Sequence, residues 1–364
     1  MSVRLEAEHL YKVFGSRQEE AVERLRTGAD REELRSEGTT AGVIDASFSV
    51  ESGKIFVVMG LSGSGKSTLL RMLNGLSEPT SGHVKFDGDD LTALPAKELR
   101  AVRSHKISMV FQHFALFPHR SVLENAAYGL AVQGVPRAER EQRAAEALAL
   151  TGLEGWEKSF PDELSGGMQQ RVGLARALAT DAELLLMDES FSALDPLIRR
   201  DMQDQLLVLQ KKLKKTIVFI THDLNEAMRL GDRIAVMRDG RIVQNGTPED
   251  ILVRPADDYV ANFIQDVDRS RVLTAGAVME SPEALRSGSG SVSGRTDLTD
   301  TELLAKAPAR VGPDTPLAEL FAPCAQRAAE PVAVVEDEVL VGVVSQERLL
   351  AVLGAAGDPV TARA

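Results

Sequence analysis

The chain contains a complete match to the phosphate-loop pattern G-x-x-x-x-G-K-[ST], namely Gly60-Leu61-Ser62-Gly63-Ser64-Gly65-Lys66-Ser67. The apolar run 55–59, which predicts a strand, precedes it, and a helical pattern over 67–76 follows. A strand that turns through glycines into a helix directs unpaired backbone N–H groups and the positive helix end at one point. We expect Lys66 to contact the β- and γ-phosphates and the Ser67 hydroxyl to bind Mg²⁺. The loop therefore predicts ATP or GTP binding.

Residues 1–268 are expected to form one α/β domain with a mainly parallel sheet, because strand-like runs alternate with helical ones. The pairs are 55–59 with 67–76, 107–111 with 137–150, 184–187 with 197–215, and 216–220 with 223–230. A hairpin with an Asp239-Gly240 turn follows. Thr247 then has the pattern of a helix N-cap.

Composition narrows the class of protein. A length of 364 residues is enough for two domains, and the net charge of −12 argues against a nucleic-acid partner. No apolar run approaches the ~20 residues needed to span a bilayer, and residues 1–10 lack a signal core. The single cysteine, Cys324, fits a reducing cytoplasm.

Two segments stand apart from the α/β pattern. The charge-dense insertion 18–40 has helical spacing at Ala21, Val22, Leu25 and Leu34 and predicts an exposed helix without chemistry. Residues 269–364 predict a small second domain, with a flexible Ser/Gly-rich tract from Ser287 to Gly294. This domain ends in a strand, an acidic turn at 336–338, a second strand over 339–344 and a helix over 346–353.

Five further features accompany the phosphate loop. They are Gln112 after the strand 107–111, the signature segment Ser165-Gly166-Gly167-Met168-Gln169-Gln170-Arg171, the pair Asp188-Glu189 after an apolar strand, the run Ser192-Ala193-Leu194-Asp195, and His222 after the strand 216–220. In this order they resemble the nucleotide-binding subunit of an ABC transporter over residues 3 to about 265. The resemblance implies an ATPase domain with a helical subdomain at about 112–165.

The resemblance also implies a role for each residue. Asp188 holds Mg²⁺ through water, Glu189 polarises the attacking water, and His222 contacts the γ-phosphate. Gln112 senses Mg²⁺ and the γ-phosphate. Phe14 stacks on the adenine, with Tyr11 as the alternative. The implied nucleotide contacts are Phe14, Gly60, Leu61, Ser62, Gly63, Ser64, Gly65, Lys66, Ser67, Thr68, Gln112 and Asp188, of which Ser67, Gln112 and Asp188 serve the metal.

The signature segment implies a dimer. Ser165, Gly166 and Gly167 open a helix and form a second anion site. In the resembling family this site closes on ATP bound by the other subunit of a head-to-tail dimer, with Gln169 and Asp195 at the shared interface. Both half-sites are intact here, so we expect a homodimer with two competent sites.

The kind of ABC protein can be narrowed further. A DNA-repair ATPase needs a long coiled coil between the phosphate loop and the signature segment, and this chain has no such coiled coil there. A ribosome-acting ATPase carries two cassettes in one chain, and this chain has one. We therefore expect separate transmembrane permease subunits, a substrate-binding protein that acts indirectly, and a place on the cytoplasmic face of the membrane.

The runs 56–74, 111–119 and 187–199 resemble the glycine betaine/proline importers, and the insertion 18–40 is shared with them. An amino-acid importer, for example for methionine, is the alternative. Segments 272–279 and 331–350 resemble the beginning and end of a CBS-domain pair, compressed to about 95 residues. Sensing of salt, binding of a nucleotide and simple packing all remain open for this domain.

Overall fold

The computed structural model describes residues 2–112, 114–265, 267–287, 299–326 and 330–354. The chain divides into two compact units, Met1–Asn245 and Gly246–Ala364. This division precedes α11 (Pro248–Val253), whereas the sequence placed a boundary after Asp268. The physical reason is that α11 packs on α13 (Arg269–Val272), and the Thr274 hydroxyl donates to Glu249 Oε1 at 2.7 Å.

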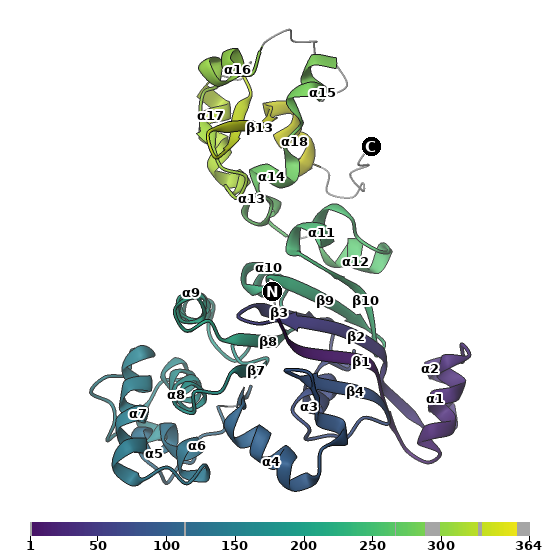
Figure 1. The fold of residues 1–364 in the computed structure, drawn as a ribbon, viewed down its shortest axis with the longest axis vertical. Coiled ribbons are helices and arrows are strands. Elements are labelled where there is room, and N and C mark those ends of the chain that lie inside the picture. The colour runs from purple at the N-terminus through teal and green to yellow at the C-terminus, as the bar shows by residue number, and fades with distance from the viewer. Residues whose placement is uncertain (1, 113, 266, 288–298, 327–329, 355–364) are drawn as a thin grey trace. The chain divides into compact units, whose positions relative to one another are not determined.

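A six-stranded sheet forms the centre of the first unit, in the order β10-β9-β3-β8-β7-β6 (Figure 1). Its strands are β3 (Ile55–Met59), β6 (Ile107–Val110), β7 (Leu184–Asp188), β8 (Thr216–Thr221), β9 (Arg233–Arg238) and β10 (Arg241–Gly246). The pairs β3–β8, β3–β9, β6–β7 and β7–β8 are all parallel. All five residues of β3 are buried, as expected for a parallel strand with both faces covered. The predicted parallel sheet is confirmed.

A second sheet of four strands is antiparallel, in the order β2-β1-β4-β5, and was not predicted. It consists of β1 (Val3–Phe14), β2 (Thr40–Glu51), β4 (Ser81–Phe86) and β5 (Asp89–Asp90). Apolar side chains of β1, β2 and β4 share one buried core with β3, β7, β8 and α3 (Lys66–Leu73). The insertion 18–40 separates β1 from β2 in sequence, and for this reason their pairing was not predicted.

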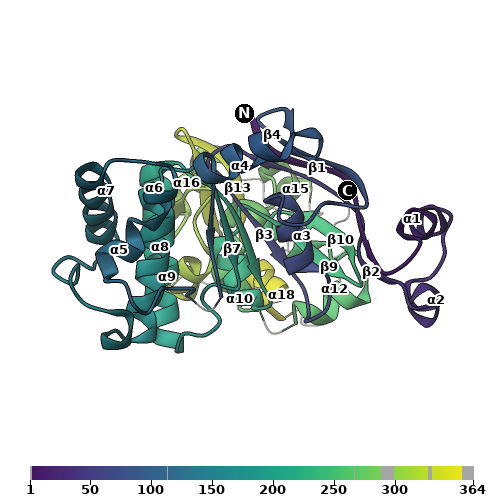
Figure 2. The same ribbon diagram turned by 90° about the horizontal axis from the view of Figure 1, so that it is seen from below.

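Helices complete the first unit. Helices α3, α4 (Ala96–His105) and α10 (Leu224–Leu230) pack against strands, and α9 (Pro196–Leu213) packs against α8 and α10. The helical subdomain consists of α5 (Val122–Ala126), α6 (Tyr128–Val132), α7 (Arg137–Leu150) and α8 (Gly166–Ala179). It has its own hydrophobic core, which includes Val172 and Ala175 of α8, so it extends past the expected limit near 165. Figures 1 and 2 both place it on the opposite side of the unit from α1 and α2.

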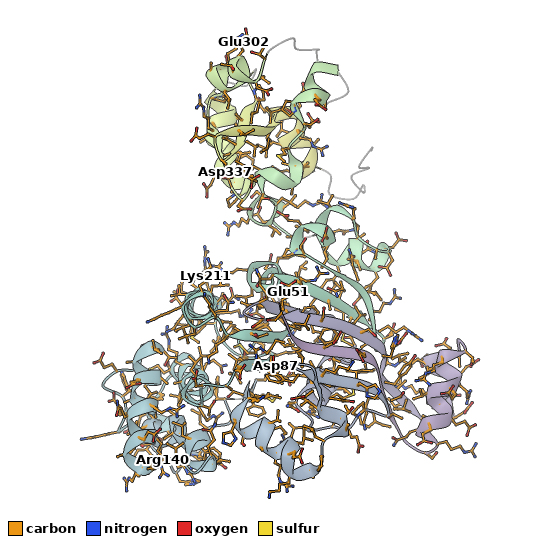
Figure 3. All side chains as sticks on the ribbon, in the orientation of Figure 1. Glu51, Asp87, Arg140, Lys211, Glu302 and Asp337 are labelled. Carbon is orange, nitrogen blue, oxygen red and sulfur yellow. The ribbon has the colours of Figure 1, made fainter. Side chains whose placement is uncertain are left out.

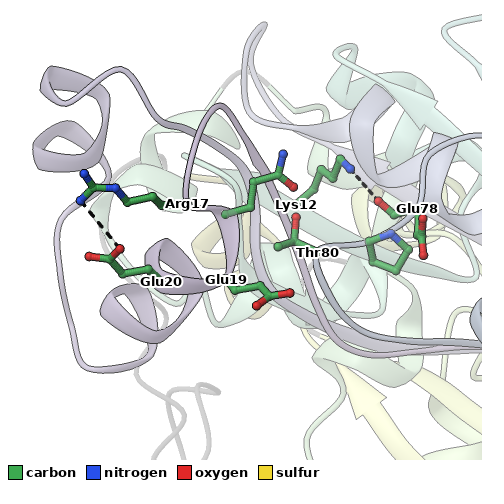
Figure 4. A pocket seen from close by; sticks show the side chains of 8 residues that line it. Lys12, Arg17, Glu19, Glu20, Glu78 and Thr80 are labelled. Carbon is green, nitrogen blue, oxygen red and sulfur yellow. Dashed lines mark hydrogen bonds and ion pairs between the residues drawn. The ribbon is translucent and has the colours of Figure 1, made fainter.

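The insertion folds into α1 (Gln18–Arg26) and α2 (Arg31–Ser36). Its apolar positions are buried against β1 and β2, in one cluster of Tyr11, Val13, Ala21, Val22, Leu25, Leu34, Ala41 and Ile44. A polar cavity of about 660 Å³ opens between α1 and the turn before β4, where Lys12 Nζ donates to the Glu78 carbonyl at 2.6 Å (Figure 4). The insertion is therefore helical, as predicted, but its inner face is a packed surface.

The second unit contains a three-stranded sheet, β11-β12-β13. Its strands β11 (Arg310–Val311), β12 (Val332–Glu336) and β13 (Val339–Val344) precede α18 (Gln346–Gly354). The predicted strand, acidic turn, strand and helix are confirmed, and Asp337 of the turn is exposed (Figure 3). Most of the Ser/Gly-rich tract, residues 288–294, lies outside the described residues. The remaining helices are α12 (Asp258–Phe263), α14 (Ala275–Val278), α15 (Pro282–Ser287), α16 (Asp300–Lys306) and α17 (Leu317–Gln326).

Among the described residues, no helix combines the length and apolar character needed to cross a bilayer.

Candidate active site

The backbone of the phosphate loop is held at two glycines. Gly60 and Gly65 have φ values of +154° and +104°, which L side chains rarely adopt. A Cβ on Gly65 would lie 2.2 Å from the carbonyl oxygen of Gly42 in β2, and one on Gly60 would lie 2.3 Å from that of Met237 in β9. The loop is therefore clamped between backbone from both sheets, and only glycine fits at either point.

The helix after the loop starts without a side-chain cap. Its N-cap is Gly65, and no side chain accepts from the N–H groups of the first turn of α3. Those groups are left for an anion, which the positive end of the helix dipole also favours. Around them, Leu61, Ser62 and Gly63 are exposed. The loop has the features of a phosphate cradle, as the sequence predicted.

Lys66 is buried at the first position of α3. Its Nζ donates to the carbonyls of Gly60 and Leu61 at 2.8 and 3.0 Å and lies 3.9 Å from Glu189 Oε1. Burial lowers the pKa of Lys66, while the carboxylates of Glu189 and Asp188 act in the opposite direction. Within the phosphate loop, the ammonium group is therefore held by carbonyl and carboxylate oxygens.

Ser67 and Asp188 form an oxygen pair next to Lys66. The Ser67 hydroxyl donates to Asp188 Oδ1 at 3.2 Å, because the N-terminus of α3 and the carboxyl end of β7 meet there. Burial raises the pKa of Asp188, and the hydrogen bond from Ser67 partly offsets that rise. A hydroxyl and a carboxylate are the hard oxygen ligands that Mg²⁺ accepts beside phosphate oxygens.

Glu189 follows the strand in a left-handed conformation, with φ of +43°, and its N–H donates to the Ile220 carbonyl at 3.0 Å. This turn directs its carboxylate toward His222, whose Nδ1 lies 3.0 Å from Glu189 Oε2. A left-handed non-glycine residue costs about 1–3 kcal/mol, which the surrounding contacts of Glu189 must offset. The two side chains can therefore share a proton or hold a water together.

Gln112 enters the site from the end of β6. Its Nε2 donates to the Ser192 hydroxyl at 3.3 Å, and that hydroxyl donates to the Glu189 carbonyl at 2.8 Å. Ser192 was not assigned a role from the sequence. Ser192 therefore links Gln112 to the backbone of Glu189, the candidate general base.

The two candidate rings for the adenine differ in exposure. Phe14 is 45% exposed and stands beside the phosphate-loop helix, since a Cβ on Gly42 would lie 3.0 Å from its Cε2 and 3.4 Å from Thr68 Cγ2. Tyr11 is buried in the core of the insertion. Only the Phe14 ring offers a free face for stacking.

The signature segment lies on the helical subdomain, away from the core that carries the phosphate loop. Ser165 caps α8 by accepting from Met168 N–H at 3.3 Å. Gln169 donates back to the carbonyls of Pro161 and Leu164 at 3.0 and 3.2 Å. Gly166 and Asp195 are exposed, and Asp195 caps α9 through Ile198 N–H at 3.1 Å.

The structure therefore brings Lys66, Ser67, Asp188, Glu189 and His222 together. Gln112 is linked to Glu189 by two hydrogen bonds through Ser192, and the signature segment lies apart from these residues. Sequence reasoning missed the backbone clamps at Gly42 and Met237, and the hydrogen bonds that Arg199 donates to carbonyls of the segment 191–194. No local pattern marks the clamps, because each joins strands distant in the chain.

Comparisons with known proteins identify the family. A family model described as ABC transporter matches residues 43–192. The glycine betaine transport ATP-binding protein OpuAA of Bacillus subtilis is 58% identical over 289 residues, which cover 79% of this chain and 69% of that protein. The glycine betaine/proline betaine transport system ATP-binding protein ProV of Escherichia coli is 46% identical over 396 aligned positions, which cover 98% of this chain and 99% of that protein.

A solved dimeric ATP-binding cassette in a post-hydrolysis state, bound to ADP and Pi, has a TM-score of 0.57 and 31% identity, covering 67% of this chain and 98% of that one.

The fold and these relatives define an ABC-type transport ATPase, a protein that hydrolyses ATP to energise an ABC transporter. Within that class, the chain belongs to the family of glycine betaine transport ATP-binding proteins. The resemblance inferred from the motifs is confirmed.

Proposed function

We propose that two copies of this chain form a head-to-tail dimer that hydrolyses MgATP and thereby energises the uptake of glycine betaine or a related quaternary amine. The observation that carries this proposal is the meeting of Lys66, the Ser67–Asp188 pair and the Glu189–His222 pair at one glycine-clamped loop. A cation, a metal-type oxygen pair and a base with its orienting imidazole are the parts that phosphoryl transfer to water requires.

Each residue has one task in this mechanism. Lys66 and the first-turn N–H groups of α3 bind the β- and γ-phosphates, and Ser67 and Asp188 hold Mg²⁺, which neutralises phosphate charge when bound. Glu189 accepts the proton of the attacking water. His222, at 3.0 Å from that carboxylate, holds Glu189 in position and donates toward the γ-phosphate.

The adenine stacks on the exposed face of Phe14. Lys12 Nζ lies over one face of the Phe14 ring, 5.4 Å from the ring centroid, so the base would stack on the opposite face. Tyr11 is buried and is left with a packing role.

The second half of each site comes from the partner copy. The start of α8, with Ser165, Gly166, Gly167 and Gln169, and the exposed Asp195 would face the nucleotide held by the other chain. The solved relative bound to ADP and Pi is dimeric, which supports this arrangement. ATP would close the dimer and hydrolysis would reopen it.

The permease docks on an apolar hollow beside β6. A cavity of about 400 Å³ there is lined by Leu76, Phe111 and Val132, all large apolar side chains with exposed surface, together with Arg100 and Arg103. Exposed apolar clusters of this kind mark protein contacts. A cytoplasmic segment of a transmembrane permease with apolar and acidic side chains would fit, and it would keep this chain at the inner membrane face. A substrate-binding protein would act only through that permease.

The cargo is proposed from the relatives, since the ATPase itself does not contact it. Both curated relatives described above carry glycine betaine in their names, which favours a quaternary amine over an amino acid such as methionine. The C-terminal unit is proposed as a compressed CBS-like regulatory domain, supported by its strand–turn–strand–helix end and by a full-length relative that aligns over it.

Trapping of the closed dimer tests the core of this proposal. Glu189→Gln keeps the shape of the side chain but cannot accept a proton, so the variant should bind ATP and elute as a dimer in size-exclusion chromatography with MgATP. The matched control is the double variant Glu189→Gln/Lys66→Ala, which should remain monomeric because it cannot hold the phosphates. A Glu189→Gln chain that hydrolyses ATP as fast as the wild type would contradict the role of Glu189.

A further inference from the structure

Arg199 binds three backbone carbonyls of the loop that leads from Glu189 to Asp195. It lies in the first turn of α9, and its guanidinium donates to Phe191 O, Ser192 O and Leu194 O at 3.2, 3.2 and 3.1 Å. The planar fork of arginine suits several acceptors in one plane, and its charge does not titrate in proteins. One side chain therefore fixes the path of residues 191–194.

The same guanidinium also reaches the turn that carries His222. Arg199 Nη1 lies 3.2 Å from Asp223 Oδ2, and Asp223 directly follows the histidine. The other oxygen, Oδ1, accepts from Glu226 N–H at 3.1 Å as the cap of α10, and Asp223 N–H donates to Thr221 Oγ1 at 2.9 Å. Because both carboxylate oxygens are engaged, the arginine is tied to a fixed point of this turn.

Both elements held by Arg199 contact Glu189. The Ser192 hydroxyl donates to the Glu189 carbonyl at 2.8 Å, and His222 Nδ1 lies 3.0 Å from Glu189 Oε2. Arg199 therefore connects the loop that ends at Asp195 to the turn that carries His222, and this connection does not involve the Glu189 carboxylate.

A second, buried contact joins the same two helices. Gln203, one turn after Arg199 in α9, donates from Nε2 to Glu226 Oε1 in α10 at 3.1 Å, and both side chains are almost fully buried. The N-terminal half of α9 is thereby held to the start of α10 at two points, which gives a continuous set of contacts through which a shift of one helix could reach the other.

We infer that Arg199 is a positioning residue that makes the 191–195 loop and the Thr221–Asp223 turn move as one, so that contact of Asp195 with the partner copy sets the position of His222 against the γ-phosphate. The inference rests on the proposed head-to-tail dimer. It assigns to a residue outside the nucleotide site the coupling between dimer closure and hydrolysis.

The test measures ATP hydrolysis and nucleotide affinity of the full chain in four forms: wild type, Arg199→Ala, Asp223→Asn and the double variant. Arg199→Ala should lower kcat at least about tenfold while KM for ATP changes less than about twofold, because the phosphate loop is untouched. Asp223→Asn keeps an oxygen that can cap α10 and removes only the charge pair. Arg200→Ala is the control, because Arg200 is an exposed arginine on the same helix whose side chain makes no hydrogen bond within the described residues, and it should behave as the wild type.

The double variant decides between coupling and a merely structural role. If Arg199 acts through Asp223, adding Arg199→Ala to Asp223→Asn should lower kcat by less than a further factor of about two, because the contact between the two residues is already broken. The inference would be overturned if Arg199→Ala lowered kcat by the same factor in the wild type and in the Asp223→Asn variant, or if Arg199→Ala alone kept the wild-type kcat. Loss of thermal stability or a raised KM in both single variants would show a structural role and overturn it as well. An inactive wild type would instead refute the proposed function, and this inference with it.

Discussion

The phosphate loop offers a comparison between two of its own glycines. Gly65 and Gly63 both have positive φ, at +104° and +80°. A Cβ on Gly65 would lie 2.2 Å from the Gly42 carbonyl oxygen, whereas one on Gly63 meets no atom within 4 Å. Substitution of each by alanine therefore separates backbone strain from a steric clash at the same site.

The magnitudes follow from this geometry. Alanine at Gly63 adds only the strain of a left-handed residue, on the order of 1 kcal/mol. This strain should weaken ATP binding about fivefold at most. Alanine at Gly65 must also move backbone by about 0.8 Å to reach the shortest real Cβ contacts. The N–H groups of α3 then no longer converge, and a loss of about 3 kcal/mol or more lowers affinity at least about 100-fold.

A fluorescent ATP analogue titrated into each purified variant with Mg²⁺ measures both affinities, and a thermal melt of each variant checks that the chain is folded. The reasoning would be refuted by a folded Gly65→Ala chain that binds the analogue as well as Gly63→Ala does.

Three further predictions concern other parts of the first unit. Phe14→Ala should raise KM for ATP about tenfold by removal of the stacking ring, whereas kcat should hold; an unchanged KM in steady-state assays would exclude Phe14 as the platform. Burial raises the pKa of Glu226 from its ordinary value of 4.5, so the folded state binds the proton more tightly and stability falls as pH rises through the raised pKa. Glu226→Gln should flatten that decline in denaturant unfolding at pH 4–8, and a slope equal to that of the wild type would contradict the assignment. Val132→Glu should abolish co-purification with the permease and leave the ATPase of the isolated chain within about twofold; Val208→Glu, at an exposed valine of α9, is its control.

Local patterns in the sequence predicted the parts of this fold that depend on local geometry. The apolar run 55–59, the glycines of the loop and the Asp239-Gly240 turn each require one backbone conformation, and the structure has β3, the clamped loop and a hairpin there. The two positive φ values of that turn, +49° and +84°, match the two-residue hairpin that a D-G pair predicts.

The antiparallel sheet could not be predicted in the same way. Its pairing of β1 with β2 joins residues such as Leu5 and Val50 across the insertion, and nothing local marks the partner. The insertion itself was expected to be an exposed helix, yet Leu25 and Leu34 are buried, because their apolar partners lie on β1 and β2. In the sequence, Arg199 appeared only as the last residue of the run 187–199. Its role could not be predicted, because it depends on carbonyl oxygens that the fold brings within 3.2 Å.

The most direct test of the account is uptake of labelled glycine betaine at high osmolarity, in cells that lack this gene and any redundant betaine importer. The account predicts that the wild-type gene restores uptake, that Glu189→Gln does not, and that the Arg200→Ala control does. Restoration by Glu189→Gln would contradict the claim that hydrolysis at this site drives transport, and no difference between cells with and without the gene would contradict glycine betaine as the cargo.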